Sequence, residues 1–177
     1  GIFIAAIMIL SIFGMMMDYA LDPEKKTTYG EYKFKIKQNK WTTKINNKEH
    51  SFYFVPQELE NLEITEQAKN ILKTKDVYTI TYDPENRDVE TIAQAIYELE
   101  QQITKPIIDT ALTNNTGTKL QQKTCKDATT HQPVIYYKEN DKTKIETDGN
   151  CIIINSKSSR DIIMQTDAIK YIMLGVI

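Results

Sequence analysis

Two histidines and two cysteines are the side chains of this chain best suited to covalent or metal chemistry. A Ser-His-Asp or Cys-His arrangement would have to use His50 or His131. Cys125, His131 and Cys151 could supply three ligands to zinc, but a structural site usually has four ligands and no CxxC spacing is present. His50 lies beside an expected hairpin turn, which indicates a solvated side chain. We therefore predict no catalytic residue, no metal site and no cofactor.

The two cysteines are interpreted as a structural disulfide. An even and minimal cysteine count in an anchored domain is typical of an oxidising compartment. If Cys125 and Cys151 are bridged, the closed loop of about 26 residues stabilises the fold by roughly 3 to 4 kcal/mol in the chain-entropy model. A catalytic dithiol of the thioredoxin type would instead place both cysteines close together at the start of a helix.

Motifs and charge argue against several other functions. The chain has no Walker A, GxGxxG or GxSxG motif, and residues 141–148 lack the order of an EF-hand calcium loop. Lys and Arg together number 22 and Asp and Glu number 24, so the net charge of -2 implies no strong attraction to nucleic acid. Only Arg87 and Arg160 offer the guanidinium group that suits phosphate or base contacts. We expect a non-enzymatic protein with no nucleic-acid partner.

Five aspartates lie at the boundaries of expected elements or within an expected helix. In such places capping, turns and salt pairing are more common than acid-base catalysis. They are Asp83, Asp109, Asp127, Asp148 and Asp167. Their spacing defines no catalytic motif, so we interpret them as structural.

The first part of the chain is an apolar segment without a charged side chain before Asp18. Extended to Leu21, a helix over this segment would be roughly 25 to 30 Å long, about the thickness of the hydrocarbon core of a bilayer. A cleavable signal peptide has a shorter apolar region and a small-x-small site, and a buried core helix usually has a polar face. We predict a transmembrane anchor over residues 1–21, a short linker over residues 22–30 and an extracytoplasmic domain over residues 31–177.

Small residues in this anchor could let a second helix approach. Gly1 and Ala5 lie four residues apart, and Ser11 and Gly14 lie three apart. We expect the bilayer, or identical apolar helices in a homo-oligomer, to be the partner of the anchor, and the sequence identifies no protein partner. The chain begins with Gly1 and has no basic residue before the apolar run. This indicates upstream residues that were removed by a pilin-type peptidase, trimmed or left out of the sequence.

The signals for the orientation of the domain conflict. Lys25, Lys26 and further lysines follow the anchor closely, and by themselves they would hold the domain in the cytoplasm. Large domains cross membranes largely regardless of their charge, however, and the cysteine pair indicates an oxidising compartment. Asn114 also begins an Asn-Asn-Thr glycosylation acceptor in a polar stretch suited to an exposed loop. We therefore predict an external domain.

Residue patterns predict a mixed α+β domain that begins with a β-meander. Tyr32, Phe34 and Ile36 alternate with lysines in the period-two pattern of a half-buried strand. The strands of this first meander are expected over residues 32–37, 41–45 and 51–55. Its outer lysines are interpreted as a solvated face that also guards against edge pairing, with contact to an anionic surface as the alternative.

The middle of the chain predicts a βαβ unit. A short helix over residues 66–73 precedes a strongly β-prone strand over residues 77–82. Asp83 and Pro84 suit the cap and the first turn of the next helix, and residues 107–112 return as a strand. Because this length is typical of a crossover unit, we expect the two strands to be parallel.

The last third of the chain predicts a second meander and a closing helix. The strands of this meander are expected over residues 133–138, 142–147 and 151–155. Ser158 or Ser159 is expected to cap the closing C-terminal helix, which runs through Met173, and Gly175 is expected to end it. Thr65 is expected to cap the short helix of the middle part in the same way.

The chain resembles small, uncharacterised, singly membrane-anchored exported proteins of archaea. The shared features are Phe13-Gly14 late in the anchor, the hairpin from Trp41 to Pro56, the start of the last strand at Cys151, and the closing helix that contains Asp167. This resemblance covers nearly the whole chain and implies a cell-surface location and this fold, without catalytic residues.

The chain is also similar to type IV pilin-like subunits, which keep an N-terminal apolar helix and place a β-rich domain outside. It departs from them because Asp18 and Asp22-Pro23 stop the apolar helix early and no acidic residue lies near position 5. We expect a membrane-anchored external domain that acts as a structural or interaction module at the cell surface. The alternatives are a pilin-like subunit of an extracellular filament and an accessory subunit of a larger membrane complex.

Overall fold

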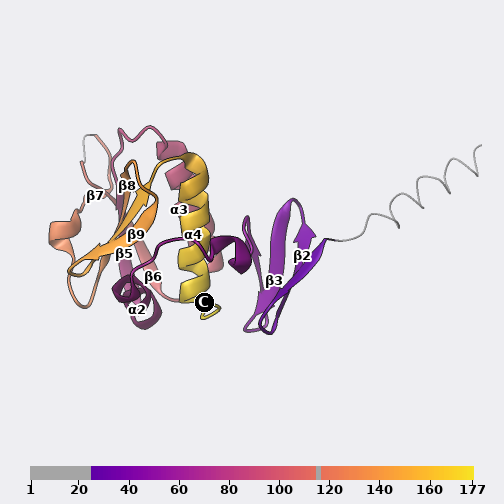
Figure 1. Cartoon of the computed structure of the whole chain (residues 1–177). Helices are drawn as coiled ribbons and strands as arrows, with labels where there is room; N and C mark the ends of the chain where they lie inside the picture. Colours follow the sequence, from indigo (N-terminus) through magenta and orange to yellow (C-terminus); the bar gives the residue numbers. More distant parts are fainter. Residues whose placement is uncertain (1–24, 115–116) are drawn as a thin grey trace, which may run out of the picture.

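A computed structural model describes residues 25–114 and 117–177 (Figure 1). These residues form an α+β fold with two sheets and three α-helices. The expected anchor, residues 1–21, lies outside the described residues. Its proposed packing positions lie there too: Gly1, Ala5, Ser11 and Gly14. Within the described ranges, no helix is both long and apolar enough to cross a membrane.

The first sheet is antiparallel, with the strand order β1-β2-β3-β4. Its strands are β1 (Lys26–Tyr29), β2 (Tyr32–Lys37), β3 (Lys40–Ile45) and β4 (Lys48–Phe52). The turns after β2 and β3 have positive φ at Gln38 and Asn39 and at Asn46 and Asn47, as tight two-residue hairpins require. The expected meander is confirmed in its order of strands, but its third strand, expected over residues 51–55, is β4 and begins earlier, at Lys48. The sheet also gains one strand, because β1 forms within the range expected to be linker.

The second sheet has six strands in the order β7-β6-β5-β8-β10-β9. Its strands are β5 (Val77–Tyr82), β6 (Ile107–Leu112), β7 (Gln121–Gln122), β8 (Val134–Glu139), β9 (Lys144–Asp148) and β10 (Cys151–Ser156). Because β5 and β6 pair in parallel, the predicted βαβ unit is confirmed.

The predicted second meander is wrong. β10 pairs in parallel with β8 and antiparallel with β9, so β9 lies at the edge of the sheet instead of between the other two strands. β8 and β10 carry apolar side chains on both faces, which suits central strands covered on both sides. β9 alternates charged and apolar residues and is only partly buried, which suits an edge.

The helices are α2 (Glu66–Thr74), α3 (Val89–Gln102) and α4 (Ser159–Met173). The predicted caps Thr65 and Ser158 are confirmed, because their side chains accept hydrogen bonds from the first turns of α2 and α4. The predicted start of the middle helix at Asp83-Pro84 is wrong. The backbone N–H of Asn86 donates to the carbonyl of Asp83, which closes a turn, and α3 begins only at Val89.

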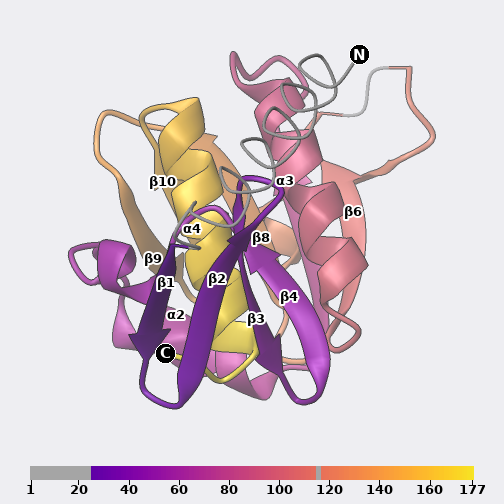
Figure 2. The same ribbon diagram turned by 90° about the vertical axis from the view of Figure 1, so that its right-hand side faces the viewer.

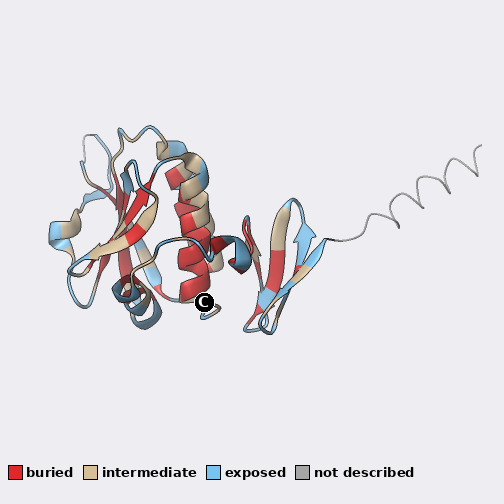
Figure 3. Cartoon of the chain, in the orientation of Figure 1, coloured by how far each residue is buried: buried red, intermediate tan, exposed pale blue. Residues whose placement is uncertain are grey.

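α4 lies between the two sheets, and both of its long faces are buried (Figures 1 and 3). One face joins a core with α2, α3 and the six-stranded sheet. The other face packs on the four-stranded sheet, which lies in front of α4 in Figure 2. The buried members of this second core are Phe34, Ile45, Phe52, Phe54, Val55, Leu59, Ala168 and Tyr171. α4 is therefore the element that joins the two sheets.

Candidate functional site

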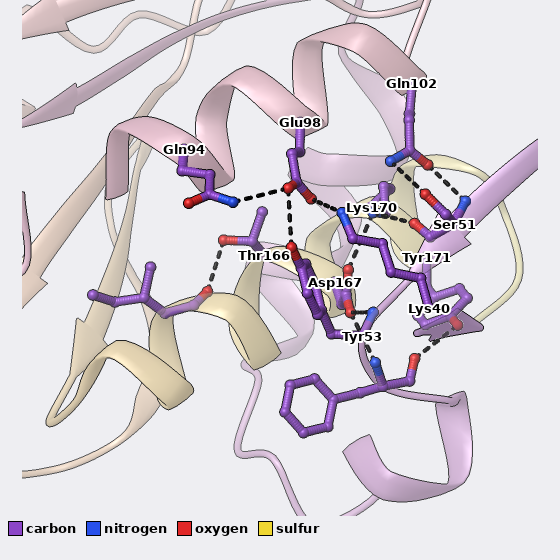
Figure 4. A network of polar contacts seen from close by, with 12 residues as sticks. Lys40, Ser51, Tyr53, Gln94, Glu98, Gln102, Thr166, Asp167, Lys170 and Tyr171 are labelled. Carbon is purple, nitrogen blue, oxygen red and sulfur yellow. Dashed lines mark hydrogen bonds and ion pairs between the residues drawn. The ribbon is translucent and has the colours of Figure 1, made fainter. Parts of the chain in front are cut away.

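The most deeply buried charges of the described residues are Asp167 and Lys170 on α4, which are 2% and 3% exposed. Lys170 Nζ lies 3.1 Å from Asp167 Oδ1, one turn away on the same helix. The pair lies at the boundary between α4 and the end of β4 (Figure 4). Because an unpaired charge in such a position is very costly, each of the two residues depends on the other.

The remaining partners of this ion pair come from the chain at and just after β4. Asp167 Oδ2 accepts hydrogen bonds from the backbone N–H groups of Tyr53 (2.6 Å) and Phe54 (3.0 Å). Lys170 Nζ donates to the carbonyl of Ser51 (2.8 Å) and lies 4.4 Å from the centre of a neighbouring phenyl ring. The pair thus satisfies backbone groups that follow the last strand of the meander.

An outer layer of polar contacts connects α3 to the same sheet. Glu98 accepts hydrogen bonds from Lys40 (2.8 Å), from the hydroxyl of Tyr53 (3.0 Å) and from Gln94 (3.2 Å). One turn further on, Gln102 accepts from the backbone of Ser51 and donates to its hydroxyl, at 2.8 and 3.1 Å. Polar side chains of α3 and of α4 therefore both form hydrogen bonds to residues in the meander or just after it.

Aromatic packing lies directly beneath these polar contacts. The ring of Tyr171 stacks on Phe52 with 3.9 Å between the centroids and 11° between the planes, and both rings form T-shaped pairs with Phe34. The hydroxyl of Tyr171 donates to the carbonyl of Phe54 at 2.9 Å. The junction between α4 and the four-stranded sheet therefore combines an apolar core with polar contacts around it.

Burial and pairing act in opposite directions on the pKa values of the charged groups in this network. Burial raises the pKa of Asp167 and lowers that of Lys170, and the attraction between them opposes both shifts. Burial would also raise the pKa of Glu98, but hydrogen bonds from Lys40, Gln94 and Tyr53 lower it overall. Glu98 and Lys40 therefore remain a stable ion pair at neutral pH.

A small cavity lies between α3, α4 and the end of β4. Its volume is about 90 Å³, and its lining includes Thr91, Glu98, Ile163 and Asp167. Typical ligand pockets measure roughly 300 to 1,000 Å³, so this space suits ordered water rather than an organic substrate. The arrangement of charges here can hold elements together, and it has little room for a reacting molecule.

The structure contains the predicted disulfide between Cys125 and Cys151, with 5.2 Å between the Cα atoms. Cys125 begins the short 3-10 helix η2 (Cys125–Asp127), and Cys151 is the fully buried first residue of β10. His131 is exposed, and the described residues hold no cluster of three or more potential metal ligands. Asn114 is exposed after β6, and the other two residues of the predicted acceptor sequence lie outside the described residues.

The interpretation of His50 as a solvated turn residue is wrong. His50 is only 3% exposed, and its Nδ1 has no hydrogen-bond partner among the residues that the structure describes. The turn at Asn46-Asn47 has two residues, so β4 begins at Lys48 and pairs His50 with Thr43. The alternation of the strand then directs His50 inward together with Phe52.

We expect the free energy of unfolding to fall as the pH drops below about 6.5, partly because of His50. Burial, followed by the charges of Lys48 and Lys170, lowers the pKa of His50 below its usual value of 6.5. The unfolded chain then binds a proton at higher pH than the folded chain does. The stabilising contribution is therefore present above pH 6.5 and is lost as the pH falls through the folded-state pKa.

Urea unfolding of the His50→Gln variant measures this contribution, because the variant should show a smaller loss of stability over the same acidic range. His131→Gln is the matched control, since that side chain is exposed. An unchanged slope in the His50 variant would rule out this origin of the pH dependence.

The sequence predicted the closing helix but not the buried ion pair on it. Asp167 and Lys170 lie outside the apolar stripe of Ile162, Ile169 and Ile172, so a single buried face would leave them in solvent. The signal in the sequence was Tyr171, an aromatic residue beside them on the supposedly polar side.

Searches found no matching protein-family model and no significant match among curated proteins or solved structures.

Proposed function

We propose that this chain is a non-enzymatic, membrane-anchored external domain that acts as a structural or interaction module. The observation that carries the proposal is the arrangement of the buried charges. Asp167 and Lys170 have each other and backbone groups as partners, and Glu98 is bound to Lys40 and Tyr53. These side chains serve to join α3 and α4 to the meander, which is what a rigid binding or spacer domain requires.

The disulfide supports a location outside the cytoplasm. Disulfides persist in oxidising compartments and are rare in the cytosol, where thiols are kept reduced. The bond between Cys125 and Cys151 joins the loop after β7 to a central strand of the six-stranded sheet. A structural bridge at this position fits a domain exposed at the cell surface.

The anchoring part of the proposal is supported by the sequence of residues 1–17, which contains no charged side chain. A charged residue at the centre of a membrane helix costs about 2.5 to 3.5 kcal/mol on the insertion scale. We expect the Ile9→Lys/Ile12→Lys variant to move from the membrane fraction to the soluble fraction, whereas the matched Ile9→Leu/Ile12→Leu variant should stay with the membrane. Fractionation of cells that express the full chain measures this difference.

The wild-type chain should also need detergent for extraction and should contain no titratable thiol in its native form. Recovery of a dispersed monomer with reduced cysteines from detergent-free supernatant would overturn the proposal. Sedimentation as a large assembly without detergent would favour the filament alternative instead. Extraction as a stable complex with other membrane proteins would favour the accessory-subunit alternative.

A further inference from the structure

One face of the four-stranded sheet is rich in lysine. Successive residues of a strand point to opposite faces, and the inner face carries Phe34 and Phe52 toward α4. The outer face, turned toward the viewer in Figure 2, carries five exposed lysines. They are Lys26, Lys33, Lys35, Lys37 and Lys44. We refer to these five residues as the lysine face.

The strand register brings these lysines close to one another. Lys26 lies directly opposite Lys35 in the pairing of β1 with β2, and like charges in such positions reduce the stability of a sheet. Glu49 on β4 pairs with Lys37 at 2.9 Å. The charges of Lys35 and Lys44, after that of Lys37, help to lower the pKa of Glu49. With Glu31, which also lines this face, two carboxylates thus lie among five ammonium groups.

This positive charge is local and is not a property of the whole chain. Residues 25–55 contain eight lysines and two glutamates, whereas the net charge of the full chain is -2. The remainder is therefore strongly acidic, so the molecule has one positive end. A molecule of this kind is oriented in the field of a negatively charged surface.

The lysine face also has a suitable shape. An open hollow of about 640 Å³ lies over it, and its lining includes Thr28, Thr42, Lys33, Lys35 and Lys44 together with Glu31 and Glu49. Hydroxyl and ammonium groups are both donors to phosphate oxygens. The hollow is open and wide, which fits several small anionic groups held side by side better than one enclosed ligand.

We propose that the lysine face docks onto the anionic phosphate headgroups of the bilayer that holds residues 1–21, an inference that rests on the proposed membrane anchoring. Only three residues, Asp22 to Glu24, separate that segment from Lys25, so the sheet cannot lie far from the membrane surface. Lysine is a compact point charge that suits mobile headgroups, and the face contains none of the arginine that favours base or bidentate phosphate recognition. Lipid is therefore favoured over nucleic acid.

Docking in this way fixes the orientation of the domain. The four-stranded sheet lies on the bilayer, α4 forms the next layer, and the six-stranded sheet is farthest from the membrane (Figure 1). The sheet that carries Cys151 of the disulfide is then on the side of the molecule away from the membrane. The junction around Asp167 and Lys170 keeps the two sheets in this order.

The test uses the full chain in lipid nanodiscs made of phosphatidylcholine alone or of phosphatidylcholine with phosphatidylglycerol. Acylation of lysines by a water-soluble ester, followed by mass spectrometry, reports which amines are covered. A lysine near an anionic surface gains about a fivefold preference for the bound state. We expect Lys37 to react at least about fivefold more slowly in the anionic discs, and we expect high salt to remove this protection.

Two matched triple variants test whether the protection of Lys37 depends on the lysine face. Lys33→Gln/Lys35→Gln/Lys44→Gln should weaken docking by about 100-fold and should bring the acylation rates of Lys37 in the two kinds of disc close together. The control replaces three exposed lysines of the rest of the domain by glutamine. Its positions are Lys73, Lys138 and Lys142. This control should keep the protection of Lys37, although it loses the same number of charges.

Failure of this inference can be told apart from failure of the proposed anchoring. Equal acylation of Lys37 in both kinds of disc, with the chain still bound to the discs, would overturn the docking and leave the anchoring intact. Loss of the chain from the discs would overturn both. Protection by added single-stranded DNA but not by anionic lipid would overturn the proposal in favour of a nucleic-acid partner.

Discussion

Replacement of Asp167 by asparagine is expected to lower the free energy of unfolding by about 3 to 5 kcal/mol. Asparagine has nearly the same shape but no charge, so Lys170 would remain buried without a counter-charge, beside the carbonyl of Ser51 and the phenyl ring of Phe52. The total stability of a domain is usually about 5 to 15 kcal/mol, so this single change removes a large part of it. Urea unfolding followed by circular dichroism measures the loss.

A double-mutant cycle separates the ion pair from other effects of the substitution. Lys170→Met alone should also be strongly destabilising, because it leaves the carboxylate of Asp167 buried without its counter-charge. The double variant should be more stable than the sum of the two losses predicts, by about 2 to 3 kcal/mol. Glu66→Gln is the control, since Glu66 forms an exposed pair with Lys69 and its replacement should leave the unfolding midpoint almost unchanged.

Additive losses in this cycle would show that Asp167 and Lys170 are not coupled. The four-stranded sheet would then be held mainly by the aromatic core of Phe34, Phe52 and Tyr171. The proposed role of the network as the junction between the sheets depends on a coupling that this experiment measures directly.

Removal of the disulfide is the second change with a large expected effect. The Cys125→Ala/Cys151→Ala variant should lose about 3 to 4 kcal/mol of unfolding free energy, because the bond closes a loop with a sequence separation of 26 residues. Alanine avoids a buried hydroxyl at position 151, where the native side chain is fully buried. Thermal and urea unfolding under oxidising conditions measure the loss.

Reduction provides the matched control for this variant. A reductant should destabilise the wild-type protein by a similar amount and should leave the double-alanine variant unchanged. If the variant were as stable as the oxidised wild type, the bond would not contribute to the stability of the fold. An equal effect of the reductant on both proteins would assign that effect to something other than this bond.

The local elements of the domain could be predicted from the sequence with good accuracy. The alternation of Tyr32, Phe34 and Ile36 identified β2. The expected caps, Thr65 for α2 and either Ser158 or Ser159 for α4, marked the starts of these helices to within one residue. The length between the two apolar runs at 77–82 and 107–112 predicted their parallel pairing. Each of these features depends on neighbouring residues or on chain length, which a sequence states directly.

Boundaries were less predictable where two local signals competed. Asp83 and Pro84 suit a helix start, but the backbone there closes a turn and Val89 begins the helix. His50 follows a polar turn, but the two-residue hairpin directs it into the core. In both cases a shift of a few residues changed which side chains are buried.

The amino-acid sequence by itself determined the apolar first segment, the separation of strands and helices, and the availability of one cysteine pair. Only the tertiary structure decided that β10 lies between β8 and β9, and that Asp167 and Lys170 are buried together. A helix covered on one side can leave charged residues in water, whereas α4 is covered on both sides. Burial on the second side depends on where a distant sheet packs, and no local pattern records that position.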